Sequence, residues 1–223
     1  MCGIVGYVGQ EQAAPILLDG LSKLEYRGYD SAGLAVYADQ KGTLEVHKAK
    51  GRLQVLSDML QGGASVHGCV GIGHTRWATH GAPSDVNSHP QVSRSGRIAV
   101  VHNGIIENYA ELKDFLMEQG VPFTYEPDTE VVAQLIEHFY EGDILQAVGR
   151  VLRRIEGAYA LGILCADDPD QIIAVRKDSP LILGYGDNCS FLASDVTAII
   201  RHTRDVVYMD DGEVAVLRRD GIQ

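Results

Sequence analysis

The residue at position 2 is a cysteine that could supply both a nucleophile and a base. The chain begins Met1-Cys2-Gly3, and an initiator methionine is normally removed when the next side chain is small. Removal would leave a thiol and a free α-amine on Cys2. The amine, with a reference pKa of about 7.7–8.0, is partly neutral at pH 7 and can take the proton of a thiol whose pKa is about 8.5. A residue of this kind can activate itself as a nucleophile, whereas a buried first-strand cysteine is the alternative interpretation.

A polar, Gly-rich segment at residues 25–33 contains Arg27. The segment follows a helical pattern and precedes an apolar strand pattern, so a helix end at Gly28 and a turn at Asp30-Ser31 would account for it. An arginine in a loop between apolar elements can also anchor a carboxylate or a chain terminus. Arg27 is therefore a candidate for holding the start of the chain.

A second segment, residues 73–81, combines the single tryptophan with arginine, histidine and threonine. Arg76 could grip a carboxylate through a two-bond fork, and Trp77 could cover it. A metal site at His74 and His80 is disfavoured, because no cysteine or carboxylate stands at ligand spacing. A purely structural role for this segment is the alternative.

Two further polar positions stand at junctions of expected elements. The apolar run 97–102 is expected to be a strand that delivers Asn103-Gly104 at its end. Asn-Gly indicates a turn, but an amide and a glycine N–H can also stabilise a developing oxyanion. Asp128 opens a helical pattern, where it would act as an N-cap or bind a ligand ammonium.

The expected elements run in the order strands, helices, strands. An apolar periodicity of three and four predicts helices, and short apolar runs between turn signals predict strands. This order favours an α+β fold, a layered αββα sandwich, over alternating βαβ units. Strands are expected at 3–9, 32–38, 43–49, 69–75, 97–102, 157–166, 171–176, 181–185, 190–194, 205–209 and 213–218, and helices at 14–24, 52–60, 108–119, 129–140 and 143–154.

Length, charge and cysteine usage limit the classes of protein. A chain of 223 residues is expected to form one domain. Its formal net charge of −11 argues against a nucleic-acid or membrane surface. The four cysteines form no C-x-x-C pair, which favours reduced cytosolic thiols, with Cys165 and Cys189 buried. No signal or spanning segment is recognisable, so a cytoplasmic location is expected.

Together these segments resemble a known family. The chain is similar to the glutaminase domain of the glutamine–fructose-6-phosphate aminotransferases, within the class II, N-terminal-nucleophile glutamine amidotransferases. The resemblance covers residues 1–223. The matching segments are CGIVGYVG at 2–9, LEYRGYDSAGLAV at 24–36, HTRWATHGAPSDVNSHP at 74–90, VVHNGIIENY at 100–109, PDTEVVAQLI at 127–136 and SPLILGYG at 179–186.

The resemblance implies a four-layer αββα sandwich and a catalytic set. Cys2 would be the nucleophile with its own amine as base. Asn103 and Gly104 would form the oxyanion hole, and Arg27 would steady the N-terminal loop.

The resemblance also implies a glutamine pocket without cofactor or metal. Arg76 would bind the α-carboxylate and Asp128 the α-ammonium, while Thr79 and His80 line the pocket and Trp77 gates ammonia. The expected partners are L-glutamine and a sugar-phosphate isomerase domain that is absent from this chain, in a full-length homodimer. A non-catalytic regulatory module and an amidase for another substrate are the alternatives.

Overall fold

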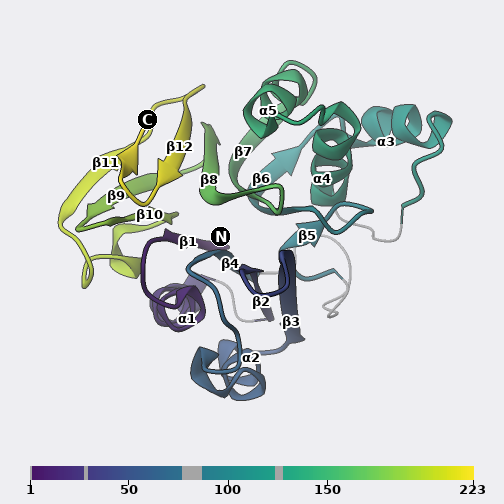
Figure 1. Cartoon of the computed structure of the whole chain (residues 1–223). Coiled ribbons are helices and arrows are strands. Elements are labelled where there is room, and N and C mark those ends of the chain that lie inside the picture. Colours follow the sequence, from purple (N-terminus) through teal and green to yellow (C-terminus); the bar gives the residue numbers. More distant parts are fainter. Residues whose placement is uncertain (1, 28–29, 77–86, 124–127) are drawn as a thin grey trace.

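Two antiparallel sheets form the centre of the molecule (Figure 1). The computed structural model describes residues 2–27, 30–76, 87–123 and 128–223. The larger sheet has the strand order β11-β9-β10-β1-β4-β2-β3, and the smaller has β13-β12-β8-β7-β6-β5. The strands are β1 (Gly3–Val8), β2 (Ser31–Ala38), β3 (Thr43–Lys50), β4 (Val70–Arg76), β5 (Gln91–Val92), β6 (Ile98–Ile106), β7 (Gly157–Cys165), β8 (Asp168–Lys177), β9 (Ile182–Gly186), β10 (Cys189–Ala193), β11 (Asp205–Tyr208), β12 (Val214–Arg218) and β13 (Gly221–Ile222).

Helices cover the outer face of each sheet. The α-helices are α1 (Ala13–Leu24), α2 (Leu53–Met59), α3 (Tyr109–Glu118), α4 (Asp128–Phe139) and α5 (Ile144–Leu152). Helices α1 and α2 share an apolar cluster with strands of the larger sheet, whereas α3, α4 and α5 share one with the smaller sheet. Figure 1 shows these helices on opposite sides of the paired sheets. The predicted αββα sandwich is confirmed.

Alternation along each strand divides the core into layers. In β1, Val5 and Tyr7 belong to the cluster under α1, whereas Ile4 and Val8 belong to the cluster between the sheets. Successive strand side chains point to opposite faces, so both faces of a covered strand are apolar. The same parity rule decides which polar side chains enter the layer between the sheets.

Most predicted elements agree with the observed ones to within a few residues, but the end of one strand was wrong. Strand β6 continues to Ile106, and Asn103 and Gly104 pair with Ala160 and Tyr159 of β7 inside it. Gly104 has φ +122°, and a Cβ there would lie 2.0 Å from the carbonyl oxygen of Ala158. Asn-Gly therefore serves a close strand pairing that only glycine tolerates, and not a turn.

The two-residue strands β5 and β13 were also not predicted, because two residues carry no readable periodicity. Cys189 was expected to be buried and is only half-buried, while Cys165 is buried as predicted.

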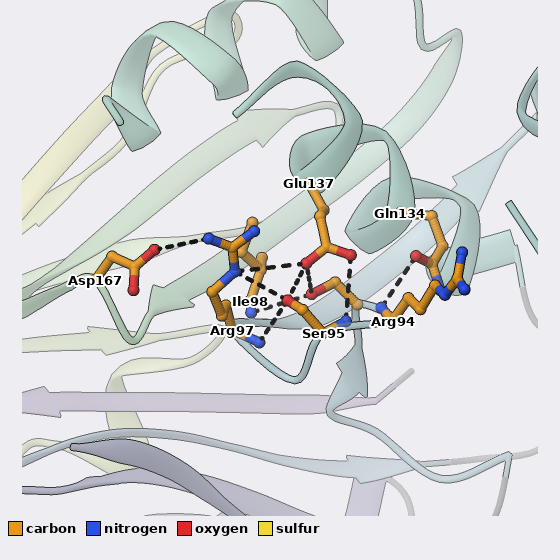
Figure 2. A network of polar contacts seen from close by, with 8 residues as sticks. Arg94, Ser95, Arg97, Ile98, Gln134, Glu137 and Asp167 are labelled. Atoms are coloured by element: carbon orange, nitrogen blue, oxygen red, sulfur yellow. Dashed lines mark hydrogen bonds and ion pairs between the residues drawn. The ribbon is translucent and has the colours of Figure 1, made fainter. Parts of the chain in front are cut away.

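The C-terminal half of α4 is held by a polar network shown in Figure 2. The Glu137 carboxylate accepts hydrogen bonds from Ser93 Oγ (3.1 Å), from the Ser95 N–H (3.2 Å) and from Ser95 Oγ. Arg97 Nε lies 3.9 Å from the same carboxylate. These contacts fix α4 against the turn between β5 and β6, and so orient the helix over β6.

Candidate active site

The backbone next to Cys2 is held by two neighbouring strands. Cys2 is half-buried, and its thiol is not part of a disulfide. Gly3 pairs with Thr75 of β4. On the other side, the Ile4 N–H donates to Ser194 Oγ (2.9 Å) and the Ser194 N–H donates to the Ile4 carbonyl (3.0 Å). The start of β1 is therefore fixed inside the larger sheet.

Asn103 reaches this segment from the opposite sheet. In β6, Ala99 and Val101 face the layer between the sheets, and Asn103 has the same parity. Its side-chain Nδ2 donates to the Cys2 carbonyl oxygen at 2.9 Å. Two predicted site residues, 101 positions apart in the sequence, are thus brought into direct contact.

His74 contacts the other end of the same amide. His74 Nε2 lies 3.0 Å from Asn103 Oδ1 and 3.1 Å from the His102 carbonyl oxygen. A carbonyl oxygen can only accept, so Nε2 carries the proton and donates to both oxygens. Burial lowers the pKa of His74 to about 3, against the opposing effect of these hydrogen bonds. His74 is therefore neutral at physiological pH.

Two more buried histidines surround this contact. His89 stacks on His74 with ring centroids 4.2 Å apart and an interplanar angle of 17°, and His89 Nδ1 accepts the His102 N–H at 3.3 Å. His102 points to the opposite face of β6, where its Nδ1 lies 3.0 Å from Thr129 Oγ1. Burial lowers the pKa of His89 and of His102. The sequence analysis assigned no role to His89 or His102. Alternation along the strand is the signal that places the His102 side chain on the face of β6 opposite Asn103.

Asp128 lies at the start of α4, next to the end of β6. Its Oδ2 accepts the backbone N–H of Ile106 at 2.8 Å, and Thr129 Oγ1 donates to its Oδ1 at 3.4 Å. The N-cap expectation needs correction, because Asp128 is the first residue of the helix and its carboxylate binds an N–H of the neighbouring strand. The side chain is 24% exposed, so a ligand can still reach it.

Arg76 is the last residue of β4 and is buried, with 6% of its surface exposed. It has the same parity as Ile72 and His74, and it therefore faces the layer between the sheets. The pairing of Gly3 with Thr75, continued by one residue, places Cys2 opposite Arg76. The positive charge of the Arg76 guanidinium contributes to the lowered pKa of His74.

Four predicted site residues fall wholly or in part outside the described part of the chain. Trp77, Thr79 and His80 lie outside the described residues, as does the side chain of Arg27. Of the predicted set, the structure brings Asn103 into contact with Cys2. It places Arg76 at the end of the strand that pairs with β1, and Asp128 beside the end of β6.

The other cysteines are poorly suited to nucleophilic attack. Burial raises the pKa of the Cys69, Cys165 and Cys189 thiols, and only a thiolate is strongly nucleophilic. Within the described ranges, no group of three or more histidine, cysteine or carboxylate side chains could hold a metal ion. Nor does any helix of those ranges have the length and apolar character needed to cross a membrane.

A sandwich of two antiparallel sheets, with a cysteine leading into the first strand, has the architecture of the N-terminal-nucleophile hydrolases. Residues 74–201, more than half of the chain, match the family model described as "Glutamine amidotransferase domain". The chain belongs to this family.

Known relatives agree with this assignment. The chain is 57% identical over all 223 residues to the glutamine–fructose-6-phosphate aminotransferase [isomerizing] of Caldanaerobacter subterraneus subsp. tengcongensis, and 51% identical to that of Thermotoga maritima. It spans 36% of the length of each of these relatives. Among solved structures, it resembles a glutamine phosphoribosylpyrophosphate amidotransferase from B. subtilis with a TM-score of 0.86 and 28% identity, covering all of this chain and 48% of that one.

Proposed function

We propose that this chain hydrolyses L-glutamine to glutamate and ammonia at Cys2. Membership of the glutamine amidotransferase family supports the reaction. The observation that carries the proposal is the 2.9 Å contact between Asn103 Nδ2 and the Cys2 carbonyl oxygen, because it brings an amide donor next to the residue that would be the nucleophile.

The chemistry follows from the groups present once Met1 is removed. The Cys2 amine takes the thiol proton, and the thiolate attacks the glutamine δ-carbon. A primary amide has two N–H groups, so Asn103 can donate one to Cys2 and the other to the developing oxyanion, with the Gly104 N–H as the second donor. The ammonium then protonates the leaving nitrogen, ammonia departs, and a γ-glutamyl thioester forms. Water then attacks the thioester while the amine takes a proton from it. The tetrahedral intermediate expels the Cys2 thiolate, glutamate departs, and the ammonium returns the proton to the sulfur.

The two ends of glutamine require opposite charges. We assign the α-carboxylate to Arg76 and the α-ammonium to Asp128. A buried guanidinium holds a carboxylate more firmly than an exposed one, because water screens the pair less. Thr79, His80 and Trp77 complete this proposed pocket, and Arg27 steadies the Cys2 segment.

In the longer protein, ammonia released here would convert fructose 6-phosphate to glucosamine 6-phosphate. The names of the relatives and the 36% share of their length support this assignment. The proposal includes a sugar-phosphate isomerase domain outside this chain, a homodimeric full-length protein and a cytoplasmic location.

A glutamate-release assay tests the function. Protein whose intact mass shows that Met1 is absent should release glutamate from glutamine, and the Cys2→Ser variant should lose this activity completely. Cys165→Ala is the matched control, because it removes a buried thiol far from the site, and it should keep wild-type kcat. Full activity in protein that retains Met1 would contradict the mechanism, and a processed but inactive wild type would favour a non-catalytic module.

A further inference from the structure

An oxyanion donor built from asparagine works in only one orientation of its amide. The Oδ1 and Nδ2 ends have nearly the same shape, so rotation by 180° would exchange donor for acceptor. In the rotated form, Oδ1 would face both the Cys2 carbonyl oxygen and the developing oxyanion. That arrangement replaces two attractive contacts with two repulsive ones, so the fold needs a device that selects the orientation of Asn103.

We propose that His74 is a positioning residue that holds the Asn103 amide with Nδ2 toward Cys2. The inference rests on the proposed function, since it explains how the oxyanion donor is set. The His74 Nε2–H donates to the His102 carbonyl (3.1 Å) and to Asn103 Oδ1 (3.0 Å). The His102 carbonyl, which cannot donate, fixes the proton on Nε2, and this donor then requires an oxygen from Asn103.

The other ring nitrogen supports the same tautomer. His74 Nδ1 is buried and has no hydrogen-bond partner within the described residues. A proton on Nδ1 would be a buried, unsatisfied donor, and leaving such a group unpaired is costly. In the Nε2–H tautomer, Nδ1 carries a lone pair and no proton. An unpaired lone pair at this buried position costs less than an unpaired N–H donor would.

The His74 ring is itself held in place. His74 is 1% exposed and stacks on His89, whose Nδ1 accepts the N–H of His102. The ring therefore lies between the strand that bears Asn103 and a second buried ring. Because the imidazole is neutral, it orients the amide without adding a second positive charge next to that of Arg76.

Nitrogen NMR tests the tautomer without reference to activity. Two-bond ¹H–¹⁵N spectra of the wild-type chain should show His74 protonated on Nε2 and unprotonated on Nδ1. In His74→Phe, which keeps an aromatic ring against His89, the Asn103 side-chain N–H signals should shift and exchange faster with solvent. A proton on Nδ1, or an unchanged Asn103 amide in His74→Phe, would overturn the inference whether or not the chain is a glutaminase.

Kinetics test the functional consequence through a double-mutant cycle. Asn103→Ala should lower kcat about 10²- to 10³-fold, and His74→Phe should lower it roughly tenfold with little change in KM. The double variant should be no slower than Asn103→Ala, because His74 acts through Asn103. His74→Gln, whose amide can replace the Nε2–H donor, should recover most of the lost kcat.

The outcomes separate the two proposals. Equal losses from His74→Phe in the wild-type and Asn103→Ala backgrounds would show that His74 does not act through Asn103. An unchanged kcat in Asn103→Ala would instead refute the oxyanion role, while the NMR result still decides the amide orientation. Ser190→Ala is the control for general destabilisation: it removes a partly buried hydrogen bond to the Arg218 carbonyl and should lower Tm without lowering kcat.

Discussion

At the scale of single residues, the site is organised by which atoms can only accept a hydrogen bond. The Cys2 carbonyl accepts from Asn103, and the His102 carbonyl accepts from His74. These two carbonyl acceptors together determine the tautomer of the His74 imidazole and the orientation of the Asn103 amide that lies between them. Asn103 is therefore more constrained than its half-buried position indicates.

An isosteric substitution at Asn103 gives the sharpest residue-scale prediction. Asn103→Asp keeps the shape of the side chain but places a carboxylate oxygen against the Cys2 carbonyl and the developing oxyanion. We expect Asn103→Asp to lose more kcat than Asn103→Ala, although alanine changes the shape more, because a missing donor costs about 10²–10³ in rate and a negative charge adds repulsion. Steady-state glutamate release, with circular dichroism as the check on folding, measures this. A milder loss in Asn103→Asp than in Asn103→Ala would contradict the donor role.

At the scale of elements, α4 is attached to β6 and its neighbouring turn at both ends. Near its C-terminus, Glu137 binds the turn that contains Ser93 and Ser95. At its N-terminus, Asp128 accepts the Ile106 N–H. The position of the Asp128 carboxylate is therefore set by the whole helix, and the same carboxylate has both a structural and a proposed binding role.

A substitution that separates these roles tests the pocket. Asp128→Asn keeps an oxygen for the Ile106 N–H but removes the charge proposed to bind the α-ammonium of glutamine. We expect KM for glutamine to rise at least about 30-fold, since losing one half of a desolvated charge pair costs about 2–5 kcal/mol. Glutaramic acid, which lacks the α-ammonium, should be a poor substrate for both proteins and should show little difference between them.

The double cycle of enzyme and substrate measures the coupling directly. Equal losses toward glutamine and glutaramic acid would leave Asp128 as a link between helix and strand. The identity of the substrate that this pocket binds would then have to be determined anew.

At the scale of the whole molecule, the layers could be predicted from the sequence, but the contacts between layers could not. Apolar runs and helical stripes predict the αββα order, because each element must bury its apolar face. The contact of Asn103 with Cys2 depends on how two sheets face each other across 101 residues of chain, and no local pattern encodes that. Parity along β6 sends His102 and Asn103 to opposite layers, yet it becomes informative only once the strand is known to continue through Gly104.

The buried histidines give the molecule a predictable response to acid. Burial lowers the pKa of His74 to about 3 and also lowers the pKa of His89 and His102, with Asp128 partly opposing the shift at His102. The unfolded chain takes up these protons near pH 6.5, whereas the native state does not, so the unfolded state binds more protons below that pH. The free energy of unfolding should therefore fall as the pH drops below 6.5. The contribution of His74 to this free energy should keep falling until about pH 3.

Urea unfolding at pH 6.5 and pH 5 measures this dependence, and His74→Gln isolates one histidine. Each histidine that stays neutral in the native state contributes a slope of up to about 1.4 kcal/mol per pH unit. We expect His74→Gln to reduce the loss of stability over this interval by about 2 kcal/mol. His138→Gln, which changes an exposed histidine on α4, is the matched control and should keep the wild-type slope. If His74→Gln also kept that slope, the native state would bind a proton at His74, and a charged ring would lie against the amide that the proposed reaction depends on.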